Sequence, residues 1–155
     1  MHWRRIVVTG RRRRAQAFVE LALSMPVILV LLLGTYDFGR AYIIGVAVQQ
    51  GTREAARLGA GSALDSAISD DVIRQRLIDA AAPTMQGVTG AQCASACTDS
   101  QGLVWTVTIS KTPAGTPTVI AVSASTPMPL ATGFLTSLVG ISNIPITGSS
   151  QMPLL

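Results

Sequence analysis

The stretch RRRRAQAFVE, residues 11–20, followed by LALSMPVILVLLLGTY, residues 21–36, decides the fold of this chain. Ala15–Tyr36 holds 22 residues with a single charged side chain, that of Glu20. As a helix this segment would be ~33 Å long, enough to cross a hydrocarbon core of ~30 Å. The arginines before it favour the cytoplasmic side of a membrane. We therefore expect one membrane span, with the N-terminus in the cytoplasm and the later residues outside.

Composition limits what the rest of the chain can do. At 155 residues the chain has room for one small domain beside an anchor. Six of its twelve basic residues lie within residues 1–15, and the remainder carries eight acidic residues against six basic ones. The net charge of +4 is therefore local, and we expect no nucleic-acid partner. The one histidine, His2, lies in the basic leader. With no nucleophile elbow or phosphate-binding glycine loop, we expect no enzyme, no cofactor and no small-molecule substrate.

Glu20 is the unusual residue of the apolar segment. A charge inside a membrane span costs on the order of 2.5–3.5 kcal/mol near the centre and usually has a partner. One interpretation is a carboxylate that reaches back to the interface, near the positive end of the helix dipole. The other requires a cut after Ala15, which makes Gln16 the new N-terminus. Its ammonium group, in the same chain or in a neighbour, would then lie about one turn from the carboxylate and could fix the register of packed helices.

The residues Arg14–Leu23, together with Pro26, Gly34, Asp37, Gly39-Arg40 and Arg53–Arg57, resemble the TadE family. These proteins are minor pseudopilins of tight-adherence (Flp) pili, a branch of the type IV pilus systems. The resemblance is dense over residues 12–60 and thin afterwards. Ala15 stands where the family usually has glycine.

The resemblance implies a non-catalytic structural or assembly role in a pilus for adherence or secretion. It implies cleavage between Ala15 and Gln16 by a prepilin peptidase on the cytoplasmic face, with the apolar helix retained and Glu20 kept for assembly. The protein would then lie in the inner membrane with a periplasmic or pilus-associated head. Its partners would be the membrane, the peptidase, other pseudopilins and pilus assembly proteins.

Two other interpretations of the N-terminus remain open. The chain could be a single-pass anchor for an extracytoplasmic scaffold or adhesive head that no prepilin peptidase processes. It could instead be an exported protein whose N-terminus is only a signal, although residues 33–39 contain no convincing A-x-A cleavage site.

The helical pattern continues past the membrane-length segment. Ala41, Ile44, Val48, Ala55 and Leu58 follow helical spacing, with Gly51 at the missing step. The pattern predicts one helix over residues 17–58, ~63 Å long, with a kink at Pro26 and a stop at residues 59–61.

The remaining residues predict a small head. A second helix is expected over 65–82, capped by Asp65 or, if shorter, by Asp70 or Asp71, and ended by Pro83. Strands are expected over 105–110, 118–125 and 144–152, with Pro127 and Pro129 breaking the second strand. In the third strand, Pro145 indicates either an edge strand or the start of a strand. A short helix is expected over 132–139.

These elements together give an α+β, pilin-like fold, in which a long transmembrane-to-periplasmic helix packs on a small antiparallel β-sheet. We expect a basic cytoplasmic leader (1–15), a transmembrane helix (16–37), its extracytoplasmic continuation (38–60) and a small α+β head (61–155).

Cys93 and Cys97 are the only cysteines. With the head outside the cytoplasm, a disulfide between them is favoured, and it would pin the irregular connector over residues 85–101. A metal site is poorly supported because the two sulfurs lack further ligands, and redox catalysis would prefer the C-x-x-C spacing.

Overall fold

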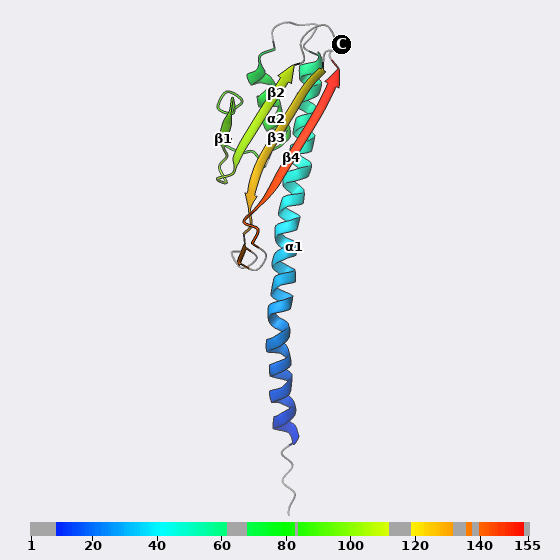
Figure 1. Cartoon of the computed structure of the whole chain (residues 1–155), viewed down its shortest axis with the longest axis vertical. Coiled ribbons are helices and arrows are strands. Elements are labelled where there is room, and N and C mark those ends of the chain that lie inside the picture. Colours follow the sequence, from blue (N-terminus) through cyan, green and yellow to red (C-terminus); the bar gives the residue numbers. More distant parts are fainter. Residues whose placement is uncertain are drawn as a thin grey trace, which may run out of the picture.

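The long helix and the antiparallel sheet predicted from the sequence are both present in the computed structural model (Figure 1). It describes residues 9–61, 68–82, 84–111, 119–131, 136–137 and 140–153, with side chains from residue 15 onward. The elements are α1 (Thr9–Gly61), α2 (Asp70–Ala80), β1 (Ala96–Thr98), β2 (Val104–Lys111), β3 (Val119–Pro129) and β4 (Asn143–Pro153). The α+β class is confirmed.

α1 is a single helix of 53 residues, longer at both ends than the predicted 17–58. Its N-terminal extension contains arginine and alanine, which are good helix formers. The helix passes through Pro26 without ending, and its ribbon curves gently along its length (Figure 1). It ends at Gly61, as the residues 59–61 predict. The first part of α1 stands clear of the head, and only its later part is packed.

The sheet has the order β1-β2-β3-β4, with every neighbouring pair antiparallel. β4 is an edge strand, the first of the two alternatives that Pro145 indicates. The prediction that Pro127 and Pro129 break the second strand is wrong, because β3 runs to Pro129. The pairing of β3 with β2 stops at Thr106 with Ser125, so both prolines lie beyond the paired part of these two strands. Pro127 pairs with Pro145 of β4. Neither proline has a backbone N–H to donate, and neither is paired with a strand on its other side.

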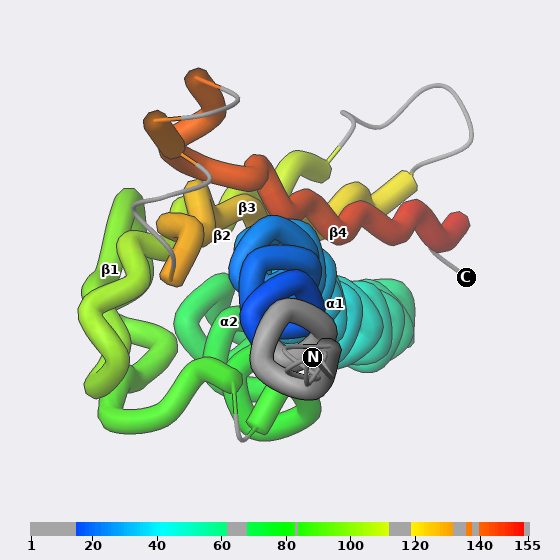
Figure 2. The backbone as a smooth tube through the Cα atoms, turned by 90° about the horizontal axis from the view of Figure 1, so that it is seen from below, coloured from blue at the N-terminus to red at the C-terminus, as the bar shows by residue number. Residues whose placement is uncertain are grey.

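The core lies where α1 meets the sheet on one side and α2 on the other, as the view along the helix shows (Figure 2). Ile44, Val48 and Ala55 of the predicted stripe are buried, and Ala41 and Leu58 are half-buried. The sheet contributes alternate residues of each strand, so that one face is buried. Its large buried side chains are Trp105, Val107, Ile120, Val122, Met128 and Ile146.

Two glycines set how closely α1 approaches its neighbours. A Cβ on Gly51 would lie 2.7 Å from the carbonyl oxygen of Leu77 in α2. A Cβ on Gly148 of β4 would lie 2.8 Å from Cγ1 of Val48 and 3.1 Å from its carbonyl carbon. Real Cβ atoms essentially never lie within 3.0 Å of another heavy atom, so a side chain at either position would force its neighbours apart. α1 therefore lies close to the backbone of α2 at Gly51, and β4 lies close to the backbone and side chain of Val48 at Gly148.

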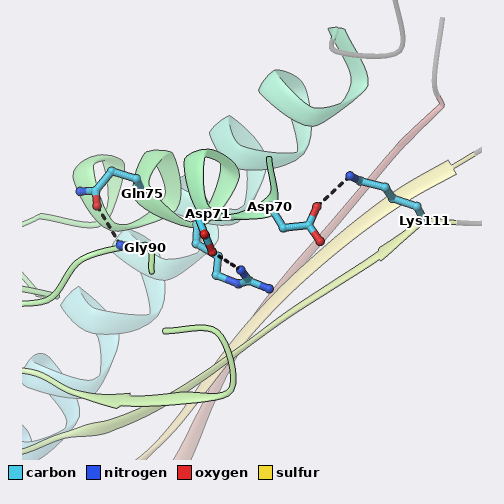
Figure 3. Close-up of polar contacts among 6 residues, drawn as sticks. Asp70, Asp71, Gln75, Gly90 and Lys111 are labelled. Atoms are coloured by element: carbon cyan, nitrogen blue, oxygen red, sulfur yellow. Dashed lines mark hydrogen bonds and ion pairs between the residues drawn. The ribbon is translucent and has the colours of Figure 1, made fainter. Parts of the chain in front are cut away.

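α2 corresponds to the shorter version of the predicted second helix. It begins at Asp70 after the N-cap residue Ser69, and it ends at Ala80. Polar contacts tie it to both sides (Figure 3): Asp70 to Lys111 of β2 at 2.7 Å, and Gln75 to the backbone N–H of Gly90 at 2.8 Å. The exposed ion pair adds ~0–1 kcal/mol, so packing carries most of the stability. Asp65, Pro83 and all but Thr136 and Ser137 of the predicted helix 132–139 lie outside the described residues.

The close approach at Gly51 gives a matched pair of substitutions in α1. Gly51→Ala should destabilise the head by about 1–3 kcal/mol, because the new methyl group overlaps α2. Gly39→Ala meets no atom within 4 Å and should be neutral or stabilising by up to about 1 kcal/mol, since alanine favours the helix. Urea unfolding of the detergent-solubilised chain, followed by the fluorescence of the buried Trp105, measures both. Equal effects of the two substitutions would contradict the backbone contact.

Candidate membrane and assembly surface

The N-terminal part of α1 is covered by nothing else in the described chain. Every side chain from residue 15 to residue 29 is exposed. By length and composition, α1 is also the one described helix that can cross a membrane. The large apolar side chains left bare over residues 18–32 are Phe18, Val19, Leu21, Leu23, Met25, Val27, Ile28, Leu29, Leu31 and Leu32. Such a surface requires lipid or other apolar helices around it.

Glu20 lies on this exposed surface. In the part of the chain that the structure describes, no side chain or backbone group is hydrogen-bonded or ion-paired to its carboxylate. Ser24, one turn further along, donates its hydroxyl to the backbone carbonyl oxygen of Glu20 at 2.8 Å. The hydroxyl of Ser24 therefore donates to the backbone and not to the carboxylate of Glu20. The carboxylate is available to a donor from outside the single chain, or to a new N-terminus created within it.

The proposed processing bond lies in the same exposed region. Ala15 and Gln16 are both exposed, and both belong to α1. The predicted helix began after this bond, whereas the observed helix contains it. Gln16 stands four residues before Glu20, which is about one helical turn. The structure thus brings Gln16 and Glu20 to neighbouring positions on one helix, as the sequence spacing indicates.

Asp37 marks the end of the bare segment. Its side chain is only 2% exposed, although its neighbours Tyr36 and Phe38 are 63% and 71% exposed. The Oδ1 atom of Asp37 accepts a hydrogen bond from the backbone N–H of Ala131, at 3.1 Å. Ala131 follows β3, so a residue distant in sequence closes over this carboxylate. From here on, one face of α1 is covered by the head.

A second buried carboxylate, Asp99, holds the turn between β1 and β2. Its Oδ1 accepts from the backbone N–H groups of Gln101 and Leu103, at 2.8 and 2.9 Å. Its Oδ2 accepts from Nε1 of Trp105 at 2.8 Å, and Trp105 is fully buried. Asp99 thereby satisfies the one polar atom of the largest core side chain.

Cys93 and Cys97 are joined by a disulfide in the structure, with their Cα atoms 4.8 Å apart. Cys97 lies in β1 and pairs with Trp105, so the bridge sits beside the same buried indole. The predicted irregular connector over 85–101 therefore contains one short strand, and that part of the prediction is wrong. Within the described residues, no group of three or more His, Cys, Asp or Glu side chains is placed to hold a metal ion.

Comparison with known protein families gives a match, and it covers the exposed part of α1 and its junction with the head. Residues 15–57 match the model of the TadE-like protein family. This segment is TadE-like. The match contains Glu20, Asp37 and the first part of the helix face that packs on the sheet, and it confirms the resemblance drawn from the sequence. No curated protein and no solved structure matches the chain.

Sequence reasoning identified Glu20 but gave no role to Asp37 and Asp99. For Asp37, the available signal was a lone carboxylate at the end of a membrane-length apolar run. For Asp99, it was one of only two charged residues after Asp79. A carboxylate is rarely kept in so uncharged a sequence unless backbone donors pair with it.

The three hydrogen bonds of Asp99 predict a large effect of its removal. Asp99→Ala should cost about 1–3 kcal/mol for each buried donor left unpaired, chiefly Nε1 of Trp105 and the N–H of Leu103. Gln101→Ala is the control, because Gln101 is exposed and donates to Asp99 only through its backbone. Urea unfolding followed by Trp105 fluorescence measures both variants. If Asp99→Ala were as stable as Gln101→Ala, the assigned role of this carboxylate would be wrong.

Proposed function

We propose that the protein is a minor pseudopilin, a structural component of a Tad-type (Flp) pilus assembly for adherence or secretion. The observation that carries the proposal is the unpartnered carboxylate of Glu20 on a bare, membrane-length helix, inside the segment that matches the TadE-like family. A chain that only needs an anchor gains nothing from this carboxylate, which makes insertion into lipid less favourable. A chain that must pack against other helices can use it.

The proposed role of Glu20 follows from charge pairing in an apolar environment. Cleavage between Ala15 and Gln16 would place an ammonium group at the start of the retained helix. In a low-dielectric surrounding, a charge-assisted hydrogen bond between this group and the carboxylate of Glu20 is stronger than in water. Pairing between neighbouring chains would fix how far one helix is displaced along the other. The exposed Ala15–Gln16 bond and the absence of a partner for Glu20 within the described chain support this arrangement.

The same proposal assigns the parts of the chain. Residues 1–15 are the cytoplasmic leader that a prepilin peptidase removes, and residues 16–37 span the inner membrane. Residues 38–60 continue the helix into the periplasm, where they support the head of residues 61–155. The partners are other pseudopilins and pilus assembly proteins, and no step of catalysis is required of the chain. The buried Asp37 at the end of the bare segment supports this division.

The first prediction of this proposal concerns the N-terminus. The chain isolated from membranes of cells that express the Tad system should begin at Gln16, and N-terminal sequencing or intact mass measures this. Deletion of the prepilin peptidase should leave the leader in place. A start at Met1 in the presence of the peptidase would instead support a static anchored scaffold. A start beyond about residue 34 would support an exported protein.

The second prediction separates assembly from membrane insertion. Glu20→Gln should leave insertion and cleavage intact but reduce pilus number about tenfold or more, as expected for loss of a charge-assisted hydrogen bond worth about 1.5–3 kcal/mol. Ser24→Ala is the control, since Ser24 is an exposed polar residue of the same segment that bonds only to the backbone. Electron microscopy counts the pili, and co-purification reports the partners. Normal pili in the Glu20→Gln strain would exclude this role of Glu20.

A further inference from the structure

The end of the β3–β4 hairpin is tied to α1 where the bare segment of that helix stops. We call its described residues the hairpin tip: Leu130, Ala131, Gly140, Ile141 and Ser142. The backbone N–H of Leu130 donates to the carbonyl oxygen of Ser142 at 3.3 Å, which closes the hairpin. The N–H of Ala131 donates to Oδ1 of Asp37 at 3.1 Å. The position of Asp37 along α1 therefore fixes the position of the hairpin tip.

Helix geometry places Asp37 at a membrane surface. The rise from Gln16 to Asp37 is about 32 Å, against a hydrocarbon core of about 30 Å. Tyr36 and Tyr42, which are 63% and 65% exposed, lie about 1.5 Å and about 7.5 Å from Asp37 along the helix axis. Tyrosine is enriched at the boundary between hydrocarbon and water. If residues 16–37 cross the membrane, Asp37 and the hairpin tip that covers it must lie in its interfacial layer.

The shape of the head agrees with this placement. In Figure 1 the end of the β3–β4 hairpin is the part of the head that reaches farthest toward the N-terminus of α1. In Figure 2, seen along the helix, the same end lies to the side of α1. The two views together place the end of the hairpin beside α1 and not on the helix axis.

The chemistry of the hairpin tip suits an interface with lipid. Ile141 is 50% exposed, and among the described residues outside α1 only Val72 and Val104 are comparably exposed large hydrophobics. The sequence carries no charged residue after Lys111. The hairpin tip can therefore enter the interfacial layer without desolvating a charge, while Asp37 is shielded from lipid by the same contact.

We propose that the hairpin tip rests in the interfacial layer of the membrane that α1 crosses, as a second contact between the head and the lipid. The inference rests on the membrane span proposed above. One helix alone would leave the head free to tilt and to turn about the helix axis. A second contact to one side of α1 fixes both, so each head faces its neighbours in a defined orientation before assembly.

Nitroxide labels on single introduced cysteines test this contact. The described cysteines are both in the disulfide, which leaves the introduced thiol as the reactive one. Ile141→Cys reports on the hairpin tip, and Val72→Cys is the matched control, because both side chains are 50% exposed. Leu29→Cys, 49% exposed in the bare segment, reports on the membrane span itself. The full chain is reconstituted in vesicles of phosphatidylethanolamine and phosphatidylglycerol.

The measured quantity is the collision rate of each label with oxygen, which concentrates in lipid, relative to a water-soluble nickel chelate. The expected ratio at position 141 is severalfold above that at position 72 and below that at position 29. A ratio at 141 equal to that at 72, with position 29 in lipid, overturns the hairpin contact and leaves the membrane span standing. A label at position 29 in water overturns both the span and the contact.

Discussion

The structure depends on the continuity of one helix through two different environments. Up to Tyr36, α1 is bare around its circumference over most of its length, and from Asp37 onward one face is covered by the head. Partial cover begins at the half-buried Val30, Leu33 and Gly34. The same face is fully buried at Asp37, between the exposed Tyr36 and Phe38. The helix does not break there, so the bare segment and the covered segment belong to one continuous element.

The covered part of α1 packs closely against its neighbours at two glycines. Gly51 lets the carbonyl of Leu77 approach, and Gly148 lets β4 lie against Val48. These small residues bring a helix, a second helix and a sheet together with few large side chains between them. At the other end of the sheet, Asp99 and the Cys93–Cys97 bridge hold the turn around Trp105. The head is held by its buried apolar side chains, by these close approaches and by the hydrogen bonds of the buried Asp37 and Asp99.

Much of this fold follows from sequence periodicity. The apolar run and the helical spacing of Ile44, Val48 and Ala55 predicted α1 and its buried face, and the alternation around Trp105 predicted β2. Sequence reasoning failed where the effect of a residue depends on its neighbour in space. Pro127 is tolerated in β3 because it lies beyond the last pair with β2, and no local sequence pattern shows where the pairing of two strands stops. β1 exists because Cys97 pairs with Trp105, a contact that the short run of residues 96–98 does not suggest alone.

Of the two carboxylates on α1, the sequence predicted the exposure of Glu20 but not the burial of Asp37. Glu20 is conspicuous in sequence because it is alone in an apolar segment, and its exposure follows from that position. Asp37 is adjacent to a similar segment, but its burial depends on Ala131, 94 residues further along the chain. The register of the β3–β4 hairpin determines where Ala131 lies, and so whether it can cover Asp37. The two carboxylates therefore differ in their contacts: that of Glu20 has no partner among the described residues, whereas that of Asp37 has one.

The continuity of α1 across the junction is tested most directly by a distance between two spin labels. Leu29→Cys and Arg53→Cys place labels on exposed positions on either side of Asp37. In a continuous helix the 24 residues between them span about 36 Å. Pulsed electron-electron double resonance on the full chain in lipid nanodiscs should give one narrow distribution centred near that distance. A broad distribution, or one centred well below it, would show a hinge at the junction and contradict the account.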